Sequence, residues 1–118
     1  MDPALLNLKI RRGLTWPGFA ITCRDANGAA VPLAGWTAYG QIRTKAEGGT
    51  LVYDLAPVIA ADDADGLITI PEIPHDVTRT LPAGDFVYDV IPEDPLGRRL
   101  DPIVAGQIKS SISVTQIP

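Results

Sequence analysis

Apolar and polar residues alternate with a period of two over residues 104–115. One face of this segment would carry Val104, Gly106, Ile108, Ser110, Ile112 and Val114. The opposite face would carry Ala105, Gln107, Lys109, Ser111, Ser113 and Thr115. Successive side chains of a β-strand point to opposite sides of a sheet, whereas helical positions repeat every 3.6 residues. The pattern therefore predicts a long, half-buried strand, and the rest of the chain must supply a sheet around it.

Shorter segments with the same period come before this strand. We expect strands over residues 5–12, 18–24, 36–44, 51–55, 67–70 and 85–91. Turn residues separate these segments at roughly the 8–12-residue spacing of sandwiches and small barrels. Pro74 can begin one helical turn over residues 75–80, because proline suits the first helical position. The chain is thus predicted to be all-β, with about seven short antiparallel strands and one short helical turn.

The size and charge of the chain limit its class. Its 118 residues suffice for one domain, which we expect to span residues 1–118. A net charge of −4 argues against nucleic acid as a partner, since such surfaces are basic. No apolar run approaches the length of a bilayer span, and the first residues lack the pattern of a signal peptide. A single cysteine, Cys23, fits a protein made in a reducing cytoplasm.

The side chains that support catalysis or metal binding do not occur in recognisable patterns. One cysteine, Cys23, and one histidine, His75, are too few for a zinc site. No glycine-rich phosphate loop and no nucleophile elbow is present. We therefore expect a non-enzymatic protein without cofactor or metal. The acidic residues Asp62, Asp63 and Asp65 leave two alternatives open, a solvated turn or a calcium site unlike an EF-hand.

Two aromatic residues and one basic pair are candidates for a partner interface. Trp36 begins an inward-facing set and is predicted to be a core anchor. Trp16 lies between two expected strands, and the sequence is equally compatible with a core role and with a role in binding a partner. The predicted interface residues are Trp16, Pro17, Tyr39, Arg98 and Arg99.

Four segments, in this order, resemble small virion proteins of tailed phages and prophages. They are residues 10–13 followed by Phe19, residues 32–43, residues 80–90, and residues 97–100 with 106–108. These proteins are similar to the N-terminal immunoglobulin-like domain of phage baseplate upper proteins. The chain departs from the pattern at Ala34, at residues 14–17 and at the proline-rich residues 92–95.

The resemblance implies a fold and a setting, and it implies no catalytic residue. The fold is an immunoglobulin-like β-sandwich. The setting is the virion, with other virion proteins as partners, in a homo-oligomer or a larger assembly. The first hypothesis is a structural adaptor between baseplate or tail and tail fibres. The alternatives are a decoration protein on the capsid and a carbohydrate-binding module that uses Trp16 or Tyr39.

Overall fold

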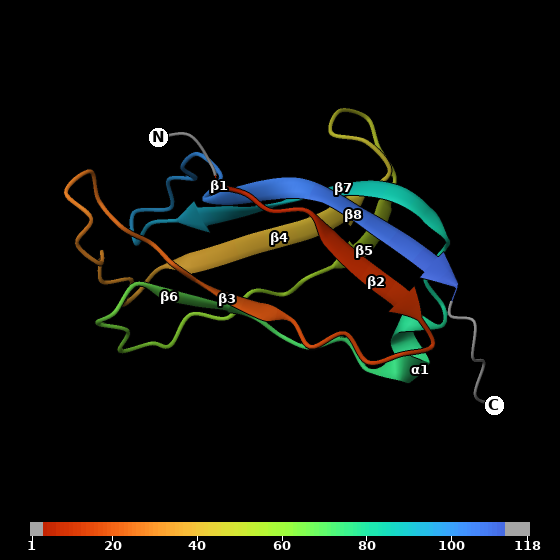
Figure 1. Cartoon of the computed structure of the whole chain (residues 1–118). Coiled ribbons are helices and arrows are strands. Elements are labelled where there is room, and N and C mark those ends of the chain that lie inside the picture. Colours follow the sequence, from red (N-terminus) through yellow and green to blue (C-terminus); the bar gives the residue numbers. More distant parts are fainter. Residues whose placement is uncertain (1–3, 113–118) are drawn as a thin grey trace.

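The computed structural model describes residues 4–112, which form eight strands and one short helix (Figure 1). The elements are β1 (Ala4–Leu5), β2 (Leu8–Arg12), β3 (Phe19–Thr22), β4 (Thr37–Arg43), β5 (Leu51–Asp54), β6 (Leu67–Ile70), α1 (His75–Thr78), β7 (Gly84–Glu93) and β8 (Val104–Ile112). Each predicted strand and the predicted helical turn has a counterpart among them. Within residues 4–112 no helix has both the length and the apolar character needed to cross a membrane.

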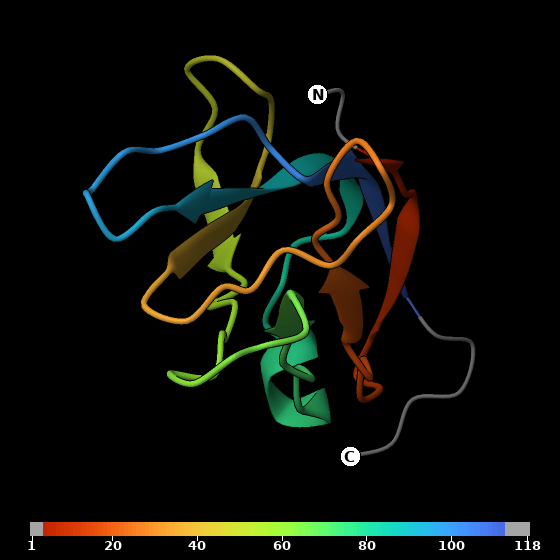
Figure 2. The ribbon, with the colours of Figure 1, turned by 90° about the vertical axis from the view of Figure 1, so that its left-hand side faces the viewer.

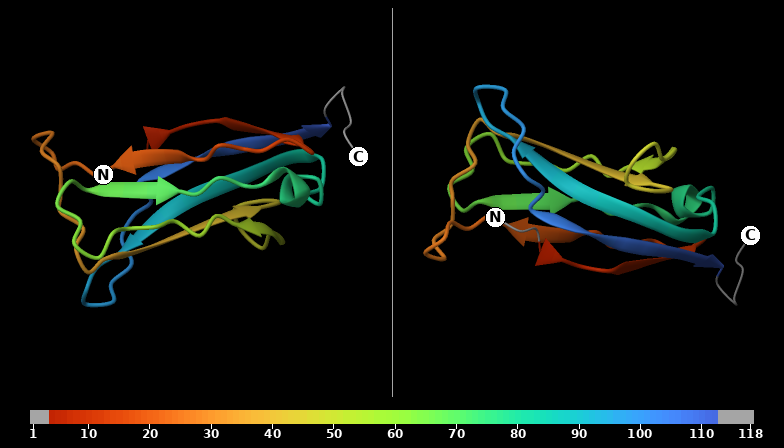
Figure 3. Two further views of the ribbon diagram at one scale, coloured as in Figure 1. Left: turned by 90° about the horizontal axis from the view of Figure 1, so that it is seen from below. Right: turned by 90° about the horizontal axis from the view of Figure 1, so that it is seen from above.

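The strands form two layers of unequal size. The larger sheet has the order β1-β8-β7-β4-β5, with β2 also paired to β8. The smaller sheet consists of β3 and β6, which lie against the larger one (Figure 3). The second and fifth predicted strands thus share one layer, while the third, sixth and seventh share the other together with the first and fourth. This division is that of an immunoglobulin sandwich, so the predicted all-β, immunoglobulin-like fold is confirmed.

The prediction that all strands are antiparallel was wrong at one edge. Both β1 and β2 run parallel to β8, in one register in which Ala4 pairs with Val104 and Leu8 pairs with Ile108. A period of two indicates which face a residue occupies and contains no information on strand direction. The constant register also shows that β1 and β2 are one interrupted strand, so eight strands correspond to seven predicted segments.

The interruption lies where the edge strand crosses Gly106. The Leu6 carbonyl leaves the ladder, lies over Gly106 and accepts a hydrogen bond of 2.6 Å from the Tyr88 hydroxyl. The Asn7 side-chain oxygen takes its place in the ladder and accepts the Gln107 N–H at 3.1 Å. A Cβ atom on Gly106 would collide with the Leu6 carbonyl. Glycine is therefore required here by the close approach of another backbone.

The core lies between the two layers. Its almost fully buried members are Ile10, Leu33, Ile42, Ile68, Ile70, Ile73, Val90 and Ile108. On β8 the predicted inward residues Val104, Ile108 and Ser110 are buried, whereas Ile112 is 57% exposed. The strand ends at Ile112, and the predicted strand residues 113–115 lie outside the described part of the chain.

Strand β7 continues through Pro92, where the sequence predicts the start of a turn. The Pro92 carbonyl accepts the Leu100 N–H at 3.0 Å, on the side opposite β4. The backbone nitrogen and carbonyl of one strand residue point to the same side. The nitrogen of Pro92, which carries no hydrogen, therefore also faces residues 99–100, before the start of β8. The proline therefore costs β7 no hydrogen bond to β4.

The short helix α1 lies at one end of the strands (Figure 1), on the side of the smaller sheet (Figure 2). Its Thr78 side chain is fully buried, donates to the Leu14 carbonyl at 2.8 Å and accepts the Gly13 N–H at 3.1 Å. These bonds attach the turn before β7 to the turn after β2, although the two are about 65 residues apart in the chain.

Candidate functional site

Two predicted interface residues, Tyr39 and Arg99, lie together on the outer face of the larger sheet. The Arg99 guanidinium carbon lies 5.3 Å from the centroid of the Tyr39 ring. Glu93 accepts a hydrogen bond of 3.0 Å from Arg99, which raises the pKa of this arginine. Both Tyr39, at 42% exposed, and Arg99 remain accessible to a partner. Cation–π packing of this kind holds two large side chains in a defined arrangement.

The neighbouring Arg98 is held by its own turn. Asp94 is 6% exposed and accepts hydrogen bonds from the Leu96 and Arg98 N–H groups, at 3.0 and 2.9 Å. Its second oxygen lies 2.6 Å from the Arg98 Nε. The backbone hydrogen bond from Arg98 contributes most to lowering the pKa of Asp94. Arg98 thus stabilises the turn that presents Arg99, while most of its side chain stays exposed.

The structure does not support Trp16 as an interface residue. Its side chain is 7% exposed and packs edge-to-face on Phe19, with ring centroids 5.9 Å apart. Its backbone exchanges two hydrogen bonds with Ile73, of 2.9 and 2.8 Å, which draw the indole into the core. Pro17 is exposed, but it lies in the connection between β2 and β3, away from the sheet that carries Tyr39. The predicted interface set is therefore divided.

Trp36, predicted as a core anchor, is only half-buried. It precedes β4 and packs against the edge of the core, while Ala38 and Ile42 of the same predicted set are buried. Trp36 contributes to the core from its rim.

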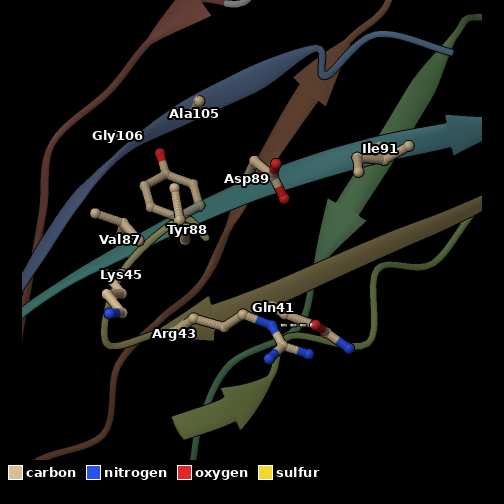
Figure 4. Close-up of a pocket in the computed structure, with 10 residues that line it drawn as sticks. Gln41, Arg43, Lys45, Val87, Tyr88, Asp89, Ile91, Ala105 and Gly106 are labelled. Atoms are coloured by element: carbon tan, nitrogen blue, oxygen red, sulfur yellow. Dashed lines mark hydrogen bonds between the residues drawn. The ribbon is translucent and has the colours of Figure 1, made fainter. Parts of the chain in front are cut away.

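A hollow of about 420 Å³ lies on the outer face of the larger sheet, next to the hairpin between β4 and β5 (Figure 4). Its lining residues are Gln41, Arg43, Lys45, Ala46, Val87, Tyr88, Asp89, Ile91, Ala105 and Gly106. Tyr39 is paired with Ile91, so the Tyr39–Arg99 contact borders the hollow. We call the whole area, from Tyr39 and Arg99 to the hollow, the outer-face surface.

The polar groups of the hollow are not equally satisfied. Arg43 donates from Nε to the Gln41 amide oxygen at 2.8 Å and from Nη1 to the Gly49 carbonyl at 2.9 Å. Its guanidinium thereby braces the hairpin loop. Asp89 is half-buried, and no Lys, Arg or His nitrogen of residues 4–112 lies within 4 Å of its carboxylate. Burial raises the pKa of Asp89.

Sequence reasoning missed Asp89, Val87 and Ile91 as parts of a surface. A signal was present, because apolar Val87 and Ile91 occupy the outward positions of β7 on either side of Asp89. Outward positions of a solvated strand are usually polar, so two apolar ones mark an unusual face.

The acidic turn before β6 has a structural role. The Asp63 carboxylate is 8% exposed and accepts hydrogen bonds from the N–H groups of Leu33, Gly66 and Leu67, at 2.8–3.2 Å. Burial raises the pKa of Asp63, but these donors outweigh burial and leave it below its usual value. Asp62 and Asp65 are exposed. Residues 4–112 contain no cluster of three or more His, Cys, Asp or Glu side chains that could hold a metal ion.

The pKa of the single cysteine is shifted in the opposite direction to that of a nucleophilic cysteine. Cys23 is half-buried against the core, and burial raises the pKa of its thiol. A reactive cysteine needs a lowered pKa. His75 is exposed on α1.

Comparisons with known proteins add little to the geometry. No family model and no curated protein matches the chain. Among solved structures, murine CRIg aligns over 94% of this chain and 93% of that chain, at 11% sequence identity and a TM-score of 0.27. The immunoglobulin-like assignment therefore depends on the strand order described above.

Proposed function

We propose that the chain is a non-enzymatic structural protein of a tailed-phage particle, which joins baseplate or tail to fibres through protein–protein contacts. The outer-face surface carries this proposal. It combines an exposed Tyr39–Arg99 pair with half-buried Val87 and Ile91 beside a hollow. Tyrosine and arginine are enriched where binding energy concentrates in protein interfaces. The phage setting is supported by the four sequence segments that resemble virion proteins.

The surface favours a protein over a sugar as partner. The carbohydrate-binding alternative relied on Trp16 or Tyr39 as a flat aromatic platform. Trp16 is buried, and the guanidinium of Arg99 lies over the Tyr39 ring, where a sugar would stack. The outer-face surface is instead a mixture of apolar, aromatic and charged groups typical of protein interfaces.

The edges of the larger sheet support assembly with further chains or copies. Strand β5 is an edge strand, and its Leu51 is 46% exposed. Unpaired strand edges readily accept an added strand. Association of copies would therefore accompany the role of an adaptor.

The proposal is tested on separated heads and tails of the phage particle. We expect mass spectrometry to find the chain with the tails. When the purified chain is added to tails that lack it, we expect it to sediment with those tails. Tyr39→Ala combined with Arg99→Ala should reduce retention at least tenfold, and the exposed Arg11→Ala in β2 should not.

Three outcomes would contradict the proposal. Presence in heads alone would favour capsid decoration. Absence from both fractions would refute a virion role. Equal retention of the double variant and the wild type would remove the outer-face surface as the interface.

A further inference from the structure

We propose that the hollow of the outer-face surface takes an arginine side chain of a protein partner, with the Asp89 carboxylate as its counter-ion. The inference rests on the proposed function, since it names what the virion partner presents. It goes further by assigning one carboxylate and one residue type to the contact.

Asp89 lies between the other outward-facing β7 residues that line the hollow. It lies in the middle of β7, paired with Gln41 on β4 and with Ala105 on β8. Val87 and Ile91 occupy the outward positions before and after it on the same strand. Its carboxylate projects from β7 into the space above the sheet, apart from the Gln41–Arg43 hydrogen bond (Figure 4).

The chain itself does not neutralise this carboxylate. Both ion pairs of the described residues lie elsewhere, between Arg98 and Asp94 and between Arg99 and Glu93. Arg43 carries the guanidinium of the facing strand, but it donates from Nε to Gln41 and from Nη1 to Gly49, and it forms no ion pair with Asp89. A carboxylate that has lost part of its water without gaining a cation is energetically unfavourable, and burial accordingly raises the pKa of Asp89. A cation from outside would reverse this penalty.

The walls of the hollow favour a guanidinium over other cations. Val87, Ile91 and Ala105 supply apolar surface around the single carboxylate of the lining. Arg43 and Lys45 also line the hollow, from the end of β4 and the hairpin loop, and neither forms an ion pair with Asp89. Guanidinium is planar and weakly hydrated, so it tolerates apolar walls and can bind a carboxylate through two hydrogen bonds. An ammonium group holds its water more strongly. Calcium needs six or more oxygen ligands, which one carboxylate and one amide do not provide.

N-acetyl-L-argininamide is a probe of this site in the intact chain. We expect it to shift the backbone amide signals of Val87, Asp89 and Ile91 in a saturable way, with affinity in the millimolar range. N-acetyl-L-citrullinamide has the same length with a neutral head group, and it should produce no comparable shifts. Asp89→Asn should weaken binding at least tenfold. The matched control Asp85→Asn removes an exposed carboxylate of the same strand and should leave binding unchanged.

The Asp89→Asn chain is expected to fold at least as stably as the wild type at neutral pH, because the substitution removes an unpaired carboxylate. Its thermal unfolding therefore separates a binding defect from a folding defect. Equal shifts with the citrulline probe, or unchanged binding by Asp89→Asn, would overturn the inference.

Retention on tails distinguishes this inference from the proposed function. If Asp89→Asn is retained as well as wild type while the Tyr39 and Arg99 double variant is lost, the arginine site is wrong and the adaptor role stands. If the arginine probe binds as expected but no virion fraction retains the chain, the site stands and the adaptor role fails.

Discussion

Replacing Tyr88 by phenylalanine should loosen the edge of the larger sheet while the core packing stays intact. The ring is 4% exposed, and its hydroxyl donates a 2.6 Å hydrogen bond to the Leu6 carbonyl. That carbonyl has left the β1–β8 ladder, so the variant leaves it without this donor. Loss of a hydrogen bond that leaves a partly buried acceptor unsatisfied costs about 1–2 kcal/mol.

Urea and thermal unfolding measure this cost. For a chain of this size, about 1–2 kcal/mol corresponds to a melting temperature lower by roughly 4–8 °C. Hydrogen exchange gives the local test: the Leu6 and Gln107 amides, which bond to the Ala105 carbonyl and the Asn7 side chain, should exchange about tenfold faster. Tyr53→Phe is the control, because among the described residues no hydrogen bond of the Tyr53 hydroxyl is found and its ring is only half-buried.

The decrease in the free energy of unfolding at alkaline pH gives an independent check. Burial raises the pKa of Tyr88 to about 12. The folded state therefore favours the neutral hydroxyl, and its contribution is complete below the ordinary pKa of about 10 and is lost as the pH rises toward 12. Tyr88→Phe should show a flatter decline over this window. An unchanged melting temperature, together with unchanged exchange at Leu6, would show that the Tyr88 hydroxyl does not stabilise this edge of the sheet.

Three further substitutions test other parts of the fold. Gly106→Ala should destabilise the chain by about 1–3 kcal/mol, because the new methyl group collides with the Leu6 carbonyl, and urea unfolding measures this loss. Asp63→Asn should lower the urea midpoint at neutral pH and reduce the loss of stability at acid pH, whereas Asp62→Asn should do neither. Because the pKa of Asp63 is lowered in the folded state, its carboxylate stabilises the fold above a pH of about 4, and this stabilisation is lost as the pH falls further. Ser110→Ala should be neutral or stabilising by up to about 1 kcal/mol in thermal unfolding, because no hydrogen-bond partner of the buried Ser110 hydroxyl occurs among residues 4–112, and a clear loss would contradict this.

Strand positions could be predicted from the sequence because burial imposes a period of two. The strand expected over residues 67–70 has those bounds in the structure, with Ile68 and Ile70 buried and Leu67 exposed. Alternation records which side faces the core. It says nothing of pairing, so neither the parallel edge at β8 nor the break at Leu6 was accessible from the pattern.

The candidate site was predicted in part for the same reason. Tyr39 is one residue out of phase with Trp36, Ala38 and Ile42 of the inward-facing set, which predicts an outward position, and the structure confirms its exposure. For Trp16 the sequence left core and partner roles open, because its burial depends on two backbone hydrogen bonds to Ile73, which is distant in the sequence. For Asp63 the sequence left a solvated turn or a calcium site open, and its structural role escaped the pattern because one of its three donors is Leu33, thirty residues away. The sequence did not identify Asp89 as a site residue, because what sets it apart is that no cation of the described residues lies near it. That is known only from the three-dimensional structure.

The parallel edge has a mechanical consequence. Ala4 lies beside Val104 and Arg12 beside Ile112, so the start of β1 and the end of β8 lie at opposite ends of this strand pair, about 26 Å apart along the strand direction. Tension applied through these ends would slide β1 and β2 along β8 in shear, loading their hydrogen bonds simultaneously. If the edge pair were antiparallel and pulled from one end, its interstrand hydrogen bonds would break one after another. We expect this topology to give the chain a high unfolding force, a property suited to a link under load.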